Sequence, residues 1–319
     1  VLLLGEVVMA PEKVVPYFGT VEKPECHLLY NVTTMASTWH TVATKDVSLL
    51  RRQLDIISEL PRDYVFQNYL RCHDDIGWGL DYEYLENFGI QEVPHKKYLN
   101  DFLTGKYPDS FARGELYNDD PRLGDARLCG TTASLCGIER FGFEGNQEGV
   151  DRAVRYDITL HAFMFSQSGI PVIYSGDEIG QVNDYSYKDD PEKSDDSRYL
   201  HRGKFDWKLA ENRHDPATVQ GKLFPVLDKL EHIRSSHGIF NSNVPIHTID
   251  TWDNSILAFV RENDEEKFIG IYNFSENDKV AWINEEDGMY TDLISGREME
   301  AKGVQIPAFG CYWLCRNKQ

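Results

Sequence analysis

Short apolar runs alternate with helical stretches along the first part of the chain. The runs that predict strands are Val1–Val8, His27–Val32, Tyr64–Cys72 and Ile170–Ser175. Near-continuous apolar runs of this kind are typical of strands buried on both faces of a sheet. Apolar residues at helical spacing predict helices over Ala36–Leu60, Val150–Ser166 and Lys222–Ser235. Parallel strands with crossover helices indicate a doubly wound sheet or a barrel, and four βα units are half of a (β/α)₈ barrel.

Two segments depart from this pattern. The sequence from about 77 to 149 is rich in Gly, Asp and Tyr with short helical pieces, which indicates an inserted subdomain. After Gly238, short and partly alternating apolar runs are separated by Asn, Asp and Gly, as in antiparallel β domains. The predicted domains are therefore a half-barrel over 1–238, carrying the insert at about 77–149, and a C-terminal β-sandwich over 239–319.

Composition limits the function classes. The 319 residues carry a formal net charge of -19, which argues against nucleic acid or an anionic membrane as partner, because phosphate binding needs an excess of Lys and Arg. A neutral or small polar substrate fits better. No apolar stretch approaches the length of a membrane span. The six cysteines show no metal-type pairs, and Cys311 and Cys315 flank an apolar run, so we expect free thiols in a reducing, cytoplasmic setting.

Acidic residues stand at the carboxyl ends of the predicted strands, where barrel enzymes carry their catalytic groups. Glu6 lies at the end of the first strand, His73, Asp74 and Asp75 follow the third, and Asp177 follows the fourth. Burial at a strand end raises a carboxyl pKa, which suits a general acid. For Glu6 a helix cap or a surface ion pair is an equal alternative. For the His-Asp-Asp cluster the alternative is a turn with a capping Asp.

Several stretches together resemble the later barrel strands of the α-amylase superfamily (glycoside hydrolase family thirteen), nearest to its amylosucrase and sucrose hydrolase branch. They are Cys72–Trp78, Ser110–Gly114, Gly124–Arg127 and Lys193–Arg198, with the ends of the first and fourth strands. The resemblance spans essentially the whole chain. It implies the second half of a (β/α)₈ TIM barrel (strands 5–8) with an inserted subdomain, followed by an antiparallel all-β C-terminal domain.

The resemblance also implies roles for individual residues. Glu6 matches the general acid/base, and Asp74 the carboxylate that stabilises the oxocarbenium-like transition state. His73 matches a histidine that hydrogen-bonds the glucosyl ring, and Asp75 and Arg127 match residues that contact the fructosyl unit of sucrose. The remaining match is Arg198, which corresponds to an arginine that pairs with an early acidic residue at the bottom of the pocket.

One position departs from the amylosucrase pattern. Lys96 stands where those enzymes have an arginine implicated in handling a growing glucan. Lysine keeps the charge but lacks the planar fork of guanidinium. This favours hydrolysis or short transfer over polymer synthesis.

The attacking carboxylate of a retaining enzyme is missing from this pattern. In the family it is an Asp closing the fourth strand, two residues after an Arg, and that strand would precede Val1. The chain opens on an apolar run without Met, as a cut domain does. Retaining glycosidases need both an acid and a nucleophile, so we expect the chain to be inactive alone. Open sheet edges should make it pair with the missing N-terminal half or self-associate.

The leading interpretation is a C-terminal fragment of a retaining α-glucoside hydrolase or transglucosidase that acts on sucrose or a related α-glucoside. A second is a fragment of a maltooligosaccharide α-glucosidase or amylase. A third, from another class, is a non-catalytic carbohydrate-binding or regulatory module. Cleavage of an acetal with acid assistance requires no cofactor, and the sequence shows no ligand set with calcium-type spacing. We expect no cofactor, no metal site, no nucleic acid and no membrane.

Overall fold

The computed structural model describes residues 1–120, 124–283 and 287–318. The chain divides into two compact units. Unit 1 comprises Val1–Tyr69, Thr159–Val172 and Asp228–Gln319, and unit 2 comprises Leu70–Ile158 and Ile173–Leu227. Two long helices, α8 and α10, each contribute to both units. These units differ from the domains predicted from the sequence, whose limits stay a prediction.

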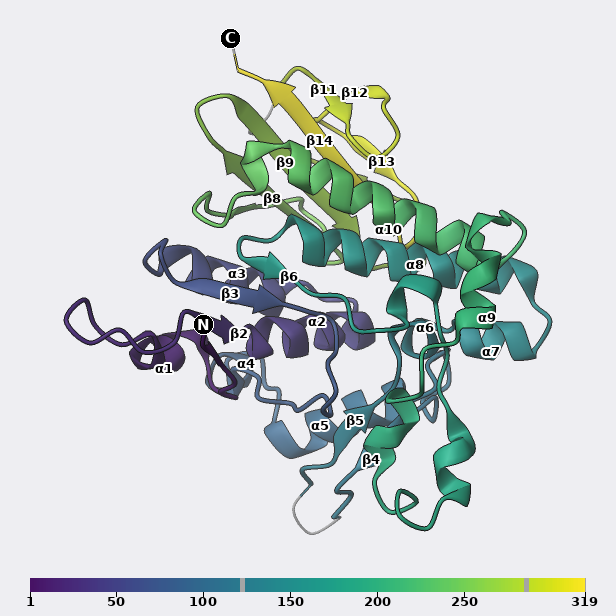
Figure 1. Cartoon of the computed structure of the whole chain (residues 1–319). Helices are drawn as coiled ribbons and strands as arrows, with labels where there is room; N and C mark the ends of the chain where they lie inside the picture. The colour runs from purple at the N-terminus through teal and green to yellow at the C-terminus, as the bar shows by residue number, and fades with distance from the viewer. Residues whose placement is uncertain (121–123, 284–286, 319) are drawn as a thin grey trace. The chain divides into compact units, whose positions relative to one another are not determined.

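Unit 1 contains a parallel sheet of four strands (Figure 1). They are β1 (Leu4–Gly5), β2 (Leu28–Tyr30), β3 (Val65–Asn68) and β6 (Ile170–Pro171), in the order β1-β2-β3-β6. All four predicted strands are present, and all are shorter than their apolar runs. The burial expected for Val1–Val8 is wrong: most of its side chains are exposed, because β1 is an edge strand with β2 as its hydrogen-bonding neighbour among the described residues.

The helices of unit 1 lie between these strands in the chain or, for α10 and η6, follow the last of them. They are α1 (Pro11–Val14), η1 (Val15–Phe18), α2 (Val32–Thr44), α3 (Ser48–Glu59), the end of α8 (Gln147–Ser166), the end of α10 (Val219–Ser236) and η6 (Gly238–Phe240). The single helix expected over Ala36–Leu60 is wrong. Lys45 adopts the left-handed conformation (φ 60°) and its amide caps α2 on the Thr41 carbonyl, while Asp46 accepts from the amide of Ser48 at the start of α3.

Gly169 allows β6 to approach β3. Its φ is +110°, and a Cβ at this position would lie 2.2 Å from the Phe66 carbonyl oxygen. Only glycine fits such a close approach without displacing the neighbouring strand. The short strand that follows then pairs in register, with Ile170 opposite Gln67 and Pro171 opposite Asn68.

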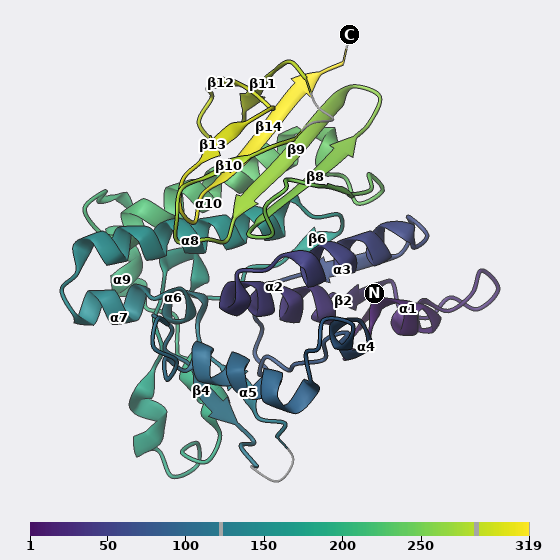
Figure 2. The same ribbon diagram turned by 180° about the vertical axis from the view of Figure 1, so that it is seen from behind.

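The C-terminal part of unit 1 is an antiparallel β domain, as predicted (Figure 2). Its strands are β7 (His247–Ile249), β8 (Ile256–Glu262), β9 (Glu266–Asn273), β10 (Lys279–Ala281), β11 (Met289–Asp292), β12 (Glu298–Glu300), β13 (Val304–Ile306) and β14 (Cys311–Asn317). Six form a sheet in the order β12-β11-β14-β9-β8-β7, and β10 pairs with β13. Buried aliphatic side chains from both sheets form one core.

The buried Arg261 and the partly buried Arg234 close the carboxyl end of α8, where helix carbonyls lack intrahelical partners. Arg261 on β8 donates to the carbonyl of Ser166 at 2.9 Å. From α10, Arg234 donates to the carbonyls of Phe165, Gln167 and Gly169. A cation at a helix carboxyl terminus also interacts favourably with the helix dipole. A side chain of the β domain, Arg261, therefore helps to complete a helix of the α/β part of unit 1.

Unit 2 is built from a short hairpin and many short helices. The hairpin is β4 (Glu115–Tyr117) with β5 (Arg127–Cys129). The helices are α4 (Tyr82–Glu86), α5 (Glu92–Leu103), α6 (Thr132–Cys136), α7 (Ile138–Phe143), the start of α8, η2 (Asp177–Ile179), η3 (Tyr185–Asp189), η4 (Ser197–His201), α9 (Trp207–Ala210), η5 (Glu211–His214) and the start of α10. The short helical pieces expected over about 77–149 lie in this unit, and the limits of the insert stay a prediction.

All six cysteines are free, and Cys129, Cys136 and Cys315 are buried. Among the described residues, no helix is both long and apolar enough to cross a membrane.

Candidate active site

The six predicted site residues fall in two groups. Glu6 lies in unit 1, one residue after β1, with an exposed side chain. His73, Asp74, Asp75, Arg127 and Arg198 lie in unit 2, where the structure brings them together.

Asp74 sits among three positively charged or protonatable groups. Its Oδ1 lies 3.3 Å from Nη1 of Arg198 and 3.2 Å from Nη2 of Arg202, and its Oδ2 lies 3.5 Å from Nε2 of His73. The side chain of Asp74 is 36% exposed. The two guanidinium groups hold the carboxylate in place, and its exposed face leaves it available to a ligand.

Asp75 points the other way, into the protein. Its side chain is 7% exposed and lies 3.2 Å from Nη1 of Arg127. Burial raises the pKa of Asp75, and the Arg127 guanidinium opposes that rise. The ion pair fixes Arg127 at the first position of β5, where the guanidinium of Arg127 also lies 5.4 Å from the ring of Tyr117.

Arg198 is held in a fixed orientation. Its Nε and Nη2 both lie 2.9 Å from the carboxylate of Asp196, a bidentate contact, and its guanidinium lies 4.6 Å from the ring of Tyr117. The hydrogen bonds from Arg198 lower the pKa of Asp196. Arg198 therefore presents Nη1 to Asp74 from a rigid fork. The pairing with an early acidic residue that the resemblance implies stays a prediction.

A buried ion pair supports this cluster. Nε of Arg71 lies 2.9 Å from Oδ1 of Asp177, and both side chains are 2% exposed. Asp177 also accepts from the hydroxyl of Thr132, and Arg71 donates to the carbonyl of His201. Charged groups at such depth are stable only when each has partners. This pair joins the segment before His73 to η2, α6 and η4.

Sequence reasoning missed three of these residues. Arg202 contacts Asp74 and donates from Nε to the carbonyl of His73. Asp196 holds Arg198 by accepting its hydrogen bonds. His201, the last residue of η4, is buried. The available signal was the spacing of Arg198 and Arg202, four residues apart at the end of an acidic segment.

Lys96 is engaged within the protein. Its Nζ lies 2.7 Å from Glu92 and 3.0 Å from Asp125, and 5.7 Å from the centre of the Tyr82 ring. A lysine with two carboxylate partners is well placed to tie α5 to the loop before β5. A role in handling a glucan would require it to leave them.

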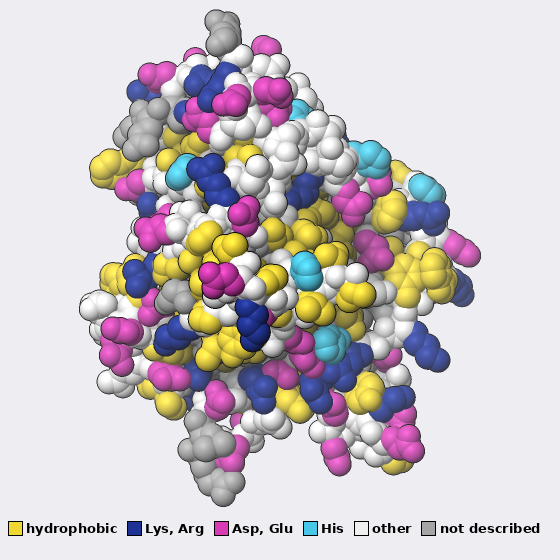
Figure 3. Space-filling view, turned by 60° about the vertical axis from the view of Figure 1, so that its left-hand side comes forward, with side chains coloured by type: hydrophobic (Ala, Val, Ile, Leu, Met, Phe, Trp, Pro, Cys, Tyr) yellow, Lys and Arg dark blue, Asp and Glu magenta, His cyan; other side chains and the backbone are white. Residues whose placement is uncertain are grey.

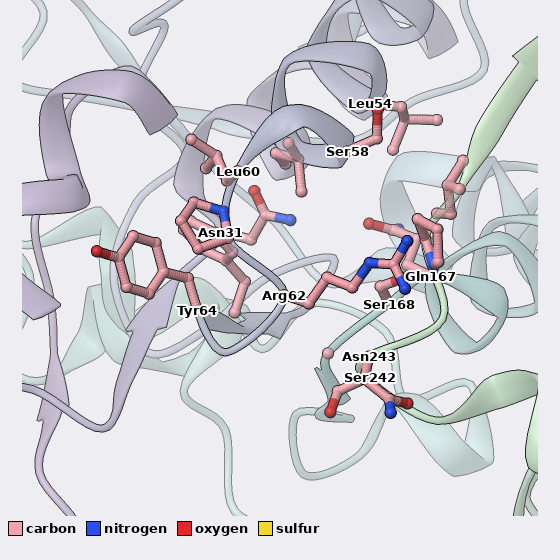
Figure 4. A pocket seen from close by; sticks show the side chains of 16 residues that line it. Asn31, Leu54, Ser58, Leu60, Arg62, Tyr64, Gln167, Ser168, Ser242 and Asn243 are labelled. Carbon is pink, nitrogen blue, oxygen red and sulfur yellow. The ribbon is translucent and has the colours of Figure 1, made fainter.

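Unit 1 contains a pocket with a volume of about 40 Å³ (Figure 4). It lies at the amino end of β3, lined by Tyr64, Arg62 and the loop before β6. Oδ1 of Asn31, on its wall, is buried and lacks a hydrogen-bond partner within the described part of the chain. Catalytic groups of barrel enzymes lie at the opposite, carboxyl end of the strands. This pocket is therefore not the candidate active site.

Comparisons with known proteins agree with the fold. Over 302 residues the chain is 24% identical to the glucosylglycerate phosphorylase of Escherichia coli (strain K12), covering 94% of this chain and 50% of that protein. No family model matches the chain. The chain spans about half the length of the curated relative that it matches.

Solved structures also match this chain over about half of their own length. The crystal structure of AmyP in complex with maltose matches with a TM-score of 0.62 at 14% identity, over 98% of this chain and 55% of that one. Sucrose 6F-phosphate phosphorylase from Thermoanaerobacter thermosaccharolyticum matches with a TM-score of 0.60 at 17% identity, over 95% and 51%. The α-amylase from H. orenii matches with a TM-score of 0.57 at 16% identity, over 100% and 54%.

These findings confirm the predicted fold class: half of an α-amylase-type TIM barrel followed by an antiparallel all-β domain. The chain is thus similar in sequence to a phosphorylase, and similar in fold to an amylase and to a second phosphorylase.

Proposed function

We propose that this chain carries the acid-bearing half of a retaining α-glucosyl hydrolase or transferase that acts on sucrose or a related α-glucoside. The observation that carries the proposal is Asp74, an exposed carboxylate held by Arg198, Arg202 and His73 just beyond β3. The carboxyl end of a barrel strand is where such enzymes place catalytic groups. The proposed activity belongs to the whole enzyme and not to this chain alone.

Each site residue has a role in the proposed reaction. Glu6 protonates the glycosidic oxygen, and Asp74 stabilises the positive charge that develops on the sugar ring. His73 hydrogen-bonds the glucosyl unit, and Asp75 with Arg127 contacts the second sugar. Such acid-assisted cleavage calls for no cofactor and no metal at this site. A cytoplasmic location fits the six free cysteines.

The attacking carboxylate is supplied from outside this chain in the proposal. Loss of a catalytic nucleophile typically removes several orders of magnitude in rate. We therefore expect the purified chain to show no turnover of sucrose, maltose or an aryl α-glucoside. Measurable hydrolysis with retained configuration would contradict this expectation.

Binding separates the enzyme proposal from an unrelated β module. We expect NMR titration to show weak binding of sucrose by the purified chain. Asp74→Asn should weaken it about tenfold, since a hydrogen bond to a charged group contributes about 1.5–3 kcal/mol. Asp109→Asn, an exposed carboxylate of the same unit, is the matched control. Equal binding by both variants would place the sugar elsewhere.

The second sugar distinguishes sucrose from maltooligosaccharides. If Asp75 and Arg127 contact a fructosyl unit, Arg127→Ala should weaken sucrose binding more than maltose binding. An equal loss favours the maltooligosaccharide alternative, in line with the maltose bound in the structure of AmyP. No binding of either sugar favours a module with another role.

Phosphorolysis is a second candidate reaction. Its support is that two similar proteins are phosphorylases, one of glucosylglycerate and one of sucrose 6F-phosphate. The whole enzyme would then transfer the glucosyl unit to inorganic phosphate rather than to water. Glucose 1-phosphate formed from sucrose or glucosylglycerate with phosphate, by the whole enzyme, would decide for this reaction, and free glucose alone would decide against it.

A further inference from the structure

Three side chains with metal-binding atoms meet in the β domain of unit 1. His237 lies between α10 and η6, Glu266 is the first residue of β9, and Cys315 lies on β14. β9 and β14 are antiparallel neighbours, with Phe268 opposite Cys315. Register places Glu266 and Cys315 on the same face of the sheet, because side chains alternate with a period of two.

The distances suit a single ion. Nδ1 of His237 contacts Oε1 of Glu266, and Sγ of Cys315 lies 3.8 Å from the same oxygen. The three candidate ligand atoms all lie within 4.8 Å of one another. In a tetrahedral zinc site with bonds of about 2.0–2.3 Å, ligand atoms lie roughly 3.5 Å apart. An ion therefore requires small movements: the His–Glu pair opens and the thiol moves closer.

The surroundings suit a site with one open position. Glu266 is 8% exposed and Cys315 5%, while the side chain of His237 is 28% exposed. Because His237 is the most exposed of the three side chains, solvent has partial access to the cluster on the side of His237. Oε2 of Glu266 accepts from the amide of Ile239 at 3.3 Å, so the carboxylate is oriented by a second contact. Such outer contacts orient metal ligands.

The charges are also balanced. A thiolate and a carboxylate neutralise a divalent cation, and neutral imidazole completes the set. In the metal-free protein, burial and the Glu266 carboxylate raise the pKa of the Cys315 thiol to about 12. Metal binding deprotonates a coordinating thiol outright. Sulfur and imidazole ligands select zinc over magnesium or calcium.

We propose that His237, Glu266 and Cys315 bind one divalent transition-metal ion, with Zn²⁺ as the expected ion and water as the fourth ligand. The site would hold η6 against β9 and β14. It lies in the β domain of unit 1, and none of its residues is among those proposed for glycoside cleavage. The sequence predicted no metal site, because it considered Cys315 together with Cys311. In the structure the neighbours of Cys315 are His237 and Glu266, which come from distant segments.

Cobalt titration of the purified, chelator-treated chain tests the proposal. We expect one equivalent of Co²⁺ to give an intense thiolate-to-cobalt absorption band that Zn²⁺ abolishes. Cys315→Ser should lose the band, and Cys311→Ser, on the same strand, should keep it. His237→Gln, at a partly exposed position, should weaken Co²⁺ binding at least tenfold and covers the case in which Cys315→Ser does not fold.

Thermal unfolding provides a second measurement. A saturating excess of Zn²⁺ should raise the Tm of the chain and of Cys311→Ser by about 5 °C, and leave that of His237→Gln nearly unchanged. No thiolate band in the unmodified chain, or the same band in Cys315→Ser, would overturn the proposal. Catalytic activity is not part of either readout, so the outcome is independent of the proposed glycoside chemistry.

Discussion

His201 carries no charge in the folded protein. Its Nδ1 accepts a hydrogen bond from the amide of Gly130 at 3.0 Å, so this nitrogen bears no proton. Burial, together with the nearby Arg71 guanidinium, lowers the pKa of His201 to about 3. In the unfolded chain its pKa is about 6.5. Between these values the unfolded state binds more protons, so stability falls as the pH falls.

We therefore expect acid to destabilise unit 2 through His201. From pH 7 to pH 4.5 the free energy of unfolding should fall by about 2–3 kcal/mol from this residue, at about 1.4 kcal/mol per pH unit below the unfolded pKa. Denaturant unfolding at several pH values measures it. His201→Asn should reduce the dependence over this range, and His214→Asn, an exposed histidine of the same unit, should not. Equal slopes for both variants would contradict the assignment.

Among individual site residues, the sequence allowed prediction of those that directly follow a strand. His73, Asp74 and Asp75 could be found because they come just after an apolar run. The contact between His73 and Asp74 follows from their adjacency. Arg202 and Asp196 could not, because they lie in a segment without strand or helix periodicity. Their positions depend on η4, which is held by the buried Arg71 and by tertiary contacts.

At the scale of elements, the Arg71–Asp177 pair joins segments far apart in the sequence. Removing one partner of a buried ion pair leaves an uncompensated charge and costs about 3–5 kcal/mol. We expect Arg71→Leu to destabilise the protein by that amount, measured by denaturant unfolding. The double variant Arg71→Leu with Asp177→Leu should recover part of the loss. A double variant as unstable as the sum of the single variants would mean that the two side chains act independently.

Helix and strand limits show what periodicity misses. Apolar spacing continues through Lys45, so the sequence predicted one helix where the structure has α2 and α3. The break depends on a left-handed lysine and an aspartate cap, which leave the apolar pattern unchanged. Strands were predicted in the right places, but their predicted lengths were too long. Hydrogen bonding with neighbouring strands, and not apolarity, sets where a strand ends.

At the scale of the whole molecule, the parallel sheet ends in two open edges. Among the described residues β1 pairs with β2 and β6 pairs with β3, and Leu4 and Ile170 are exposed. Hydrophobic side chains are visible among charged ones on the surface drawn in Figure 3. Unpaired strand edges favour pairing with further strands. This supports the expectation that these strands pair with strands from outside the described sheet, such as those of a second copy.

We expect the isolated chain to self-associate at micromolar concentration, as measured by sedimentation velocity. Leu4→Lys with Ile170→Lys should weaken association at least tenfold, because charge on an edge strand opposes pairing. Val21→Lys, an exposed apolar residue outside the sheet, is the matched control. A stable monomer of the unmodified chain would contradict this prediction.

The arginines at the end of α8 have a consequence for how the protein folds. Arg234 and Arg261 reach that helix terminus from segments 65 or more residues later in the chain. The terminus stays incomplete until β8 and α10 have folded, so the α/β part and the β domain of unit 1 should gain their final stability in one cooperative step. Proteolytic cleavage near residue 238 would then yield fragments that stay associated, and separating them would expose both to further digestion.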